Sequence, residues 1–113
     1  MKRKIITYGG YFDSFMDTLN VKEQEKVQYA LLLLKTQNKL SSKHLRFIRN
    51  ELFELRIEYN SNIYRVFLIF DKEHIVVLFN GFQKKKQKTP VSEIEKALKI
   101  KEEYYADKQS QNS

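Results

Sequence analysis

Cysteine is absent from this sequence of 113 residues, and histidine occurs only at His44 and His74. Without cysteine there can be no disulfide framework, no thiolate metal site and no thiol nucleophile. Two histidines that stand far apart in the sequence also argue against a zinc site. We therefore expect a protein that works without a metal or any other cofactor.

Long hydrophobic runs are missing as well. The longest, residues 30–34, is far too short to cross a bilayer, and the basic start at residues 1–7 lacks the apolar region of a signal peptide. We therefore expect a cytoplasmic protein. The length suits a single domain, which we place at residues 1–106, with a flexible polar tail at residues 107–113.

Positive charge is what the sequence has in excess. Lysine and arginine total 21 against 14 acidic residues, which gives a formal net charge of +7. Such an excess draws a domain toward polyanions: nucleic acid, the ribosome or an acidic membrane surface. A membrane surface is the weaker interpretation, because the last predicted helix mixes glutamates with its lysines. A soluble basic protein with no polyanionic partner is a further alternative.

Hydrophobic periodicity predicts an α+β domain. Residues 38–50 show no clean period, but Asn20 and Glu23 form a capping-box pattern at a helix start, and Thr89-Pro90 suits an N-cap followed by a first-turn proline. We expect an antiparallel sheet of about four strands, with an N-terminal helical hairpin packed on one side and a C-terminal helix. The expected strands are residues 4–8, 52–59, 63–70 and 75–82, and the expected helices are residues 11–19, 21–37 and 90–106.

Strand alternation predicts which charges share a face of the sheet. In residues 52–59 one side is wholly apolar and the other is polar. A two- or four-residue loop between these strands keeps Arg65 out of the core and sets it opposite Glu58; a three-residue loop would place it among core residues. The same step across the next hairpin sets Asn80 opposite Arg65. The polar face is then expected to carry Glu54, Arg56, Glu58, Arg65, Asn80, Phe82 and Lys84.

Arg65 is the most informative member of this face, because it interrupts a strand that is otherwise apolar. A buried arginine must find an anion or a carboxylate. It either forms a salt bridge with Glu58 or clamps a phosphate, and both can hold at once. The aromatic and aliphatic residues beside it (Phe67, Ile69 and Phe82) either form a stacking floor or lie under a loop or the last helix.

Several short segments together resemble a known family. They are Glu51–Arg56, Tyr64–Phe67, Gly81–Lys85, Lys88–Pro90 and Glu93–Ile94. Their order and spacing are similar to the HigB-like, phage-derived branch of the RelE/ParE toxin superfamily, over roughly residues 8–106. Many relatives have histidine where Asn80 stands and threonine where Lys86 stands.

The resemblance implies a RelE-like fold and the toxin of a type II toxin–antitoxin system. Such a toxin is a metal-independent endoribonuclease that cuts messenger RNA in the ribosomal A site. Its implied partners are the ribosome, its messenger RNA and a HigA-like helix-turn-helix antitoxin. The family's basic positions carry over to Arg56, Arg65, Lys84 and Lys85.

Cleavage by attack of the ribose 2′-hydroxyl needs a base, an acid and a group that stabilises charge on the phosphoryl oxygens. Arg65 and Arg56 suit the last task, and the base candidates are Glu54 and Lys84. His44 lies in a basic segment and is a weaker candidate; His74 lies at a predicted turn away from the face. We expect RNA contacts from Lys43, Arg46, Asn80, Phe82, Lys85, Lys86 and Lys88. The alternative is a non-catalytic homologue that binds nucleic acid or pairs with an antitoxin in transcriptional repression.

Overall fold

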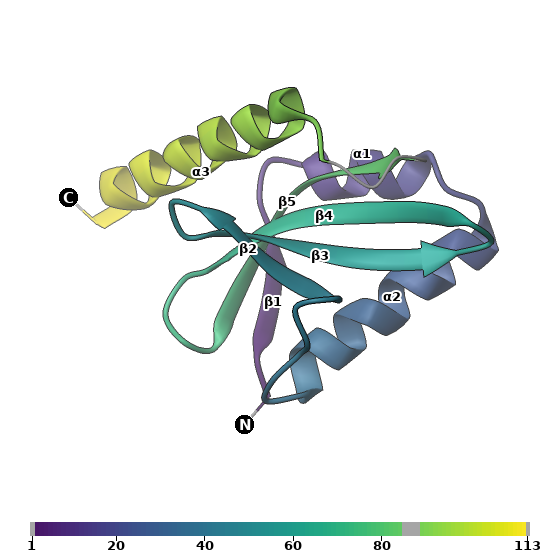
Figure 1. The fold of residues 1–113 in the computed structure, drawn as a ribbon. Helices are drawn as coiled ribbons and strands as arrows, with labels where there is room; N and C mark the ends of the chain where they lie inside the picture. Colours follow the sequence, from purple (N-terminus) through teal and green to yellow (C-terminus); the bar gives the residue numbers. More distant parts are fainter. Residues whose placement is uncertain (1, 85–88, 113) are drawn as a thin grey trace.

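A computed structural model describes residues 2–84 and 89–112. The chain forms one five-stranded sheet with helices on both faces (Figure 1). Within the described part of the chain, no helix is long and apolar enough to span a membrane. The elements are β1 (Lys4–Thr7), α1 (Tyr11–Asp17), α2 (Val21–Thr36), β2 (Leu45–Arg49), β3 (Leu52–Tyr59), β4 (Asn62–Phe70), β5 (Ile75–Lys84) and α3 (Val91–Asn112).

The sheet has the strand order β1-β5-β4-β3-β2. The pairs from β2 to β5 are antiparallel, whereas β1 lies parallel to β5 at the opposite edge. The predicted α+β class is confirmed, and the fold is compatible with that of RelE-like toxins. The expectation of about four antiparallel strands is corrected to five strands in a mixed sheet.

The strand missed by sequence analysis is β2, whose residues alternate poorly between the two faces. It pairs with β3 at the edge of the sheet, and its ladder is interrupted by a bulge between Phe47 and Arg49. Phe47 is 54% exposed even though it is apolar. An edge strand with a bulge carries a weak period-two signal, which is why residues 38–50 read as irregular.

The N-terminal helical hairpin covers one face of the sheet. The predicted capping box is confirmed: Asn20 Oδ1 accepts from the Glu23 backbone N–H, and the Glu23 carboxylate accepts from the Asn20 N–H, both at 2.8 Å. These bonds satisfy donors that a helix start leaves without partners. Buried side chains of α1 and α2 pack on the apolar side of β3, β4 and β5 and form the first core cluster.

The second face is covered by α3. Phe67 and Ile69 of β4 are fully buried and belong to one core cluster with Ala97 and Ile100 of α3. These two β4 residues are therefore core and do not form an open surface for stacking. The helix continues to Asn112, through the segment expected to be a polar tail. Contacts beyond the predicted end explain the extra length, because Lys108 pairs with Asp71 and the Tyr8 hydroxyl donates to Asp107.

In β3 and β4 the predicted assignment of side chains to the two faces is confirmed, but the predicted register is wrong. Tyr64, Val66 and Leu68 lie in the first core cluster with Leu55 and Ile57, as alternation predicted. Arg65, however, lies opposite Arg56 and not Glu58, because the two-residue turn lies at Asn60-Ser61 and Tyr59 pairs with Asn62. The Glu58 pairing needs a two-residue turn one position later, or a four-residue loop.

A bulge in β5 changes the register that was predicted for the second hairpin. Val66 lies opposite Gly81 and Leu68 opposite Leu78, so two β5 residues, Phe79 and Asn80, stand where β4 has only Phe67. The turn already differs from the predicted one, because it sets Phe70 opposite Val76, which would bring Gly81 opposite Arg65; the extra residue then shifts the partner of Arg65 to Phe82. The prediction that Asn80 faces Arg65 was therefore wrong, since alternation alone cannot detect a bulge.

Candidate active site

Two arginines lie side by side on the face of the sheet that also bears α3. Arg56 of β3 and Arg65 of β4 are directly opposed residues of an antiparallel pair. Like charges in this arrangement are destabilising, because opposed side chains on one face lie close together. Such a pair needs anions nearby, and the rest of the site is arranged around that need.

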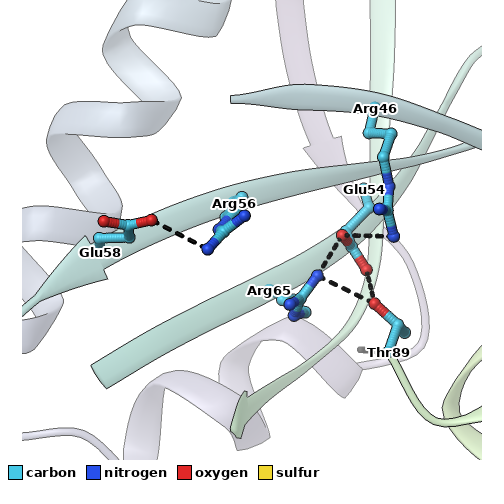
Figure 2. Close-up of polar contacts among 6 residues, drawn as sticks. All are labelled: Arg46, Glu54, Arg56, Glu58, Arg65 and Thr89. Atoms are coloured by element: carbon cyan, nitrogen blue, oxygen red, sulfur yellow. Dashed lines mark hydrogen bonds and ion pairs between the residues drawn. The ribbon is translucent and has the colours of Figure 1, made fainter. Parts of the chain in front are cut away.

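Arg65 is held in a buried polar cluster with Glu54 and Thr89 (Figure 2). Its Nη1 lies 2.6 Å from Glu54 Oε1 and 2.9 Å from Thr89 Oγ1. The Thr89 hydroxyl in turn donates to Glu54 Oε2 at 2.5 Å. Arg65 and Glu54 are each only 1% exposed, and Thr89 is 6% exposed. A buried charge pair of this kind is costly to break, because either partner alone would remain buried without compensation.

Arg46 and Glu58 complete the charges around the pair (Figure 2). Arg46 of β2 lies 3.6 Å from Glu54 Oε1, and its side chain is 52% exposed. Arg56 lies 3.0 Å from Glu58 Oε1, whose side chain is 54% exposed. Exposed ion pairs contribute little to stability. Arg56 can therefore exchange Glu58 for another anion at small cost, whereas Arg65 is fixed by Glu54.

A small cavity of about 70 Å³ opens over these side chains. Four of its lining residues are basic, and one is the Glu54 carboxylate. The sixth lining residue is Ser42, an exposed serine in the loop before β2. A concave site with an excess of fixed positive charge attracts phosphate oxygens. The lining residues are Ser42, Lys43, Arg46, Glu54, Arg56 and Arg65.

The structure brings five of the predicted site residues together in this cavity: Lys43, Arg46, Glu54, Arg56 and Arg65. Phe82 lies opposite Arg65 and stacks on Phe67 with ring centroids 5.8 Å apart. Lys84 is the last residue of β5, where its backbone lies opposite Ile63. Three predicted RNA contacts, Lys85, Lys86 and Lys88, lie outside the described residues.

Asn80 is placed differently from the expectation of an RNA contact. Its side chain is 2% exposed, and among the described residues neither its amide nitrogen nor its amide oxygen has a hydrogen-bond partner. It lies in the β5 bulge and does not line the cavity.

The hydrogen bonds of Thr89 to Glu54 and Arg65 were not predicted from the sequence. The Thr-Pro pair was interpreted as a helix cap, but α3 begins at Val91, and the Pro90 carbonyl accepts from the Ile94 N–H. Pro90 therefore takes the flanking position, and the Thr89 hydroxyl turns to Glu54. The only signal for this contact was the Lys88–Pro90 segment of the family resemblance. The register differs by two residues from the predicted one, so Arg65 lies opposite Arg56 with Glu54 and Glu58 on either side, and its ion-pair partner is Glu54.

The two histidines differ in their distance from the site. His44 is exposed, its Nδ1 lies 3.1 Å from Ser41 Oγ, and its carbonyl accepts from the Arg56 N–H at 2.8 Å. His74 lies at the other end of the sheet, beside the start of β1. Within residues 2–84 and 89–112, no group of three His, Cys, Asp or Glu side chains could hold a metal ion.

A family model described as "Phage derived protein Gp49-like (DUF891)" matches residues 14–102, which include both arginines, Glu54 and Thr89. No curated protein matches the chain.

Proposed function

The chain belongs to the phage-derived Gp49-like family, which is related to RelE-type toxins, and from this premise we propose that it is the HigB-like toxin of a type II toxin–antitoxin system. Its activity is metal-independent cleavage of messenger RNA on the ribosome, which stops translation in the cytoplasm. The observation that carries this proposal is the directly opposed pair Arg56 and Arg65 beneath a basic cavity.

The two arginines have different tasks in the proposed reaction. The ribose 2′-hydroxyl attacks the adjacent phosphorus, the bond to the 5′-oxygen breaks, and the products are a 2′,3′-cyclic phosphate and a 5′-hydroxyl. Negative charge grows on the phosphoryl oxygens as the new bond forms. Arg56 leaves the exposed Glu58 to bind these oxygens, and Arg65 adds a fixed positive charge from the strand beside it.

Glu54 acts as a positioning residue in this proposal. Both of its oxygens already accept hydrogen bonds, Oε1 from Arg65 and Oε2 from Thr89, and the side chain is 1% exposed. A carboxylate so occupied is a poor acceptor for a substrate proton, because a base must reach the hydroxyl that it deprotonates. We therefore propose that proton transfer falls to Lys43, which lines the cavity, to His44 beside it in the chain, or to Lys84, the last residue of β5.

The ribosome supplies the messenger in the A site, and the positive surface of the protein suits that polyanionic setting. A HigA-like antitoxin with a helix-turn-helix domain is the proposed inhibitor. We further propose Arg46, Lys43 and the lysines at positions 84, 85, 86 and 88 as contacts to the RNA backbone, and Phe82 as a contact to the RNA. Asn80 is left out of this set because it is buried and does not line the cavity.

Induced expression in growing bacteria tests the proposal. Wild type, Arg56→Gln and Arg49→Gln are compared by growth and by primer extension on a reporter messenger. Arg49 is an exposed arginine of β2 that does not line the cavity, so its variant loses the same charge elsewhere. We expect growth arrest and discrete in-frame cuts from wild type and Arg49→Gln, and neither from Arg56→Gln. If wild type neither arrests growth nor cuts, a non-catalytic antitoxin-pairing role replaces this proposal.

A further inference from the structure

A second hollow adjoins the active-site cavity. It has a volume of about 270 Å³ and lies between α2 and the outer edge of β3. We call it the α2–β3 groove. Its polar and aromatic lining comes from Lys26 and Tyr29 of α2, Lys43 and His44 of the loop before β2, and Arg56 and Glu58 of β3. Glu58 is its one acidic side chain, and it is paired with Arg56.

The groove is continuous with the active-site cavity, because Lys43 and Arg56 line both. The backbone hydrogen bond from Arg56 N–H to the His44 carbonyl, at 2.8 Å, ties the loop to β3 at the junction. An RNA strand whose reacting phosphate lies in the cavity would therefore pass its neighbouring nucleotide into the groove.

The lining has the chemistry that recognises single-stranded nucleic acid. The Tyr29 side chain is 60% exposed, which is unusual for a ring on a helix that packs against a sheet. Lys26, one helical turn earlier, holds its ammonium 5.5 Å from the centre of the Tyr59 ring. Exposed aromatic rings flanked by cations bind successive bases by stacking and their phosphates by charge.

We propose that the α2–β3 groove is a subsite for the single-stranded RNA nucleotide that adjoins the two joined by the cleaved bond, with Tyr29 stacking on its base and Lys43 contacting the phosphate at the junction. This inference rests on the proposed function and adds a substrate contact to it. The volume of the groove, close to the lower end for small-molecule pockets, suits one nucleotide.

A peptide is the competing occupant, and the structure favours RNA. An extended peptide binds by adding a strand to an open sheet edge. At this edge β2 pairs with β3 as far as Leu55, and β3 ends at Tyr59. Only a short stretch remains, too little for a stable added strand. The continuity with a phosphate-attracting cavity is, by contrast, what a nucleic acid chain requires.

The test is binding of uncleavable RNA of two lengths by the full chain. A dinucleotide with a 2′-deoxy sugar at the cleaved position fills the cavity alone, and a hexanucleotide with the same substitution also reaches the groove. We expect wild type to bind the hexanucleotide more tightly. Tyr29→Ala should weaken hexanucleotide binding by roughly 5- to 150-fold and leave dinucleotide binding unchanged. Tyr29→Phe should bind as wild type does, because it keeps the ring.

Leu32→Ala is the matched control, since Leu32 is an exposed α2 residue that does not line the groove. Its binding of both RNAs should equal that of wild type. If Tyr29→Ala binds both RNAs normally while Arg56→Gln weakens both, the subsite is wrong and the active site stands. Loss of antitoxin binding by Tyr29→Ala, with RNA binding intact, would likewise overturn the subsite. A wild type that binds neither RNA and cuts no messenger overturns the proposed function as well.

Discussion

Arg56 and Arg65 face each other across two antiparallel strands, yet each is paired with a different carboxylate. Arg56 pairs with the exposed Glu58 at 3.0 Å, and Arg65 pairs with the buried Glu54 at 2.6 Å. One arginine is therefore exchangeable and the other is fixed. In the proposed reaction Arg56 therefore binds the phosphoryl oxygens, whereas Arg65 is a fixed positive charge. The two residues should respond differently to substitution.

Removing the buried arginine should destabilise the fold. Arg65→Met leaves Glu54 buried without its partner, which costs about 3–5 kcal/mol of unfolding free energy. The double variant Arg65→Met/Glu54→Leu should regain much of this loss, because it removes both charges. Urea denaturation measures the stabilities, and neither variant should cleave RNA. Equal stability of wild type and Arg65→Met would contradict the buried pair.

Arg56, whose side chain is 23% exposed, should behave in the opposite way. Arg56→Gln removes a weak surface ion pair, so its unfolding free energy should stay within about 1 kcal/mol of wild type. Cleavage should fall by at least about 100-fold, the usual effect of losing one group that stabilises a transition-state charge. Glu58→Gln is the matched control and should retain cleavage. Normal cleavage by Arg56→Gln would show that Arg56 does not contact the phosphate.

The Thr89 hydroxyl should matter more than the volume of its side chain. Thr89→Val keeps the shape but removes the hydrogen bonds to Glu54 and Arg65, at a cost of about 1–3 kcal/mol. Thr89→Ser keeps the hydroxyl and should lie nearer wild type in both stability and cleavage. Denaturation and cleavage assays on both variants check this, and identical behaviour of the two would argue that the hydroxyl has no part in the cluster.

Asp71 should make the stability of the protein depend on acid pH. The Lys108 ammonium, and then the Tyr104 hydroxyl at 2.6 Å, hold the pKa of this carboxyl below its ordinary value. A lowered pKa in the folded state stabilises the fold at pH values above the unfolded pKa, about 3.9 for aspartate. That contribution is lost as the pH falls through the lowered folded pKa. The stability difference between wild type and Asp71→Asn should therefore be full at pH 6 and shrink below about pH 4. Urea denaturation across this range measures it, and a constant difference would contradict the assigned contacts.

Local patterns predicted much of this fold, because they act within a few residues. The capping box at Asn20 and Glu23 and the apolar side of β3 depend on neighbours in sequence, and both are as predicted. Pairing between strands depends on turn length and on bulges, which alternation does not detect. For this reason Arg65 was paired with Glu58 when its partner is Glu54.

The basic side of the candidate site could also be predicted, since an arginine in an apolar strand must have a partner. The contacts that complete the site could not be predicted. The approach of Thr89 depends on how α3 packs on the second face, and the placement of Ser42 and Lys43 depends on β2, a strand with a weak pattern. Contacts of this kind join segments far apart in sequence, so no local pattern indicates them.

The most direct test of the account uses purified protein, ribosomes and a defined messenger. Two messengers are compared, one natural and one with a single 2′-deoxy sugar at the mapped cleavage position. We predict that the natural messenger is cut to a 2′,3′-cyclic phosphate and a 5′-hydroxyl, and that the deoxy messenger is not cut at that position. Cleavage of the deoxy messenger, or products bearing a 5′-phosphate, would contradict the mechanism built on Arg56 and Arg65.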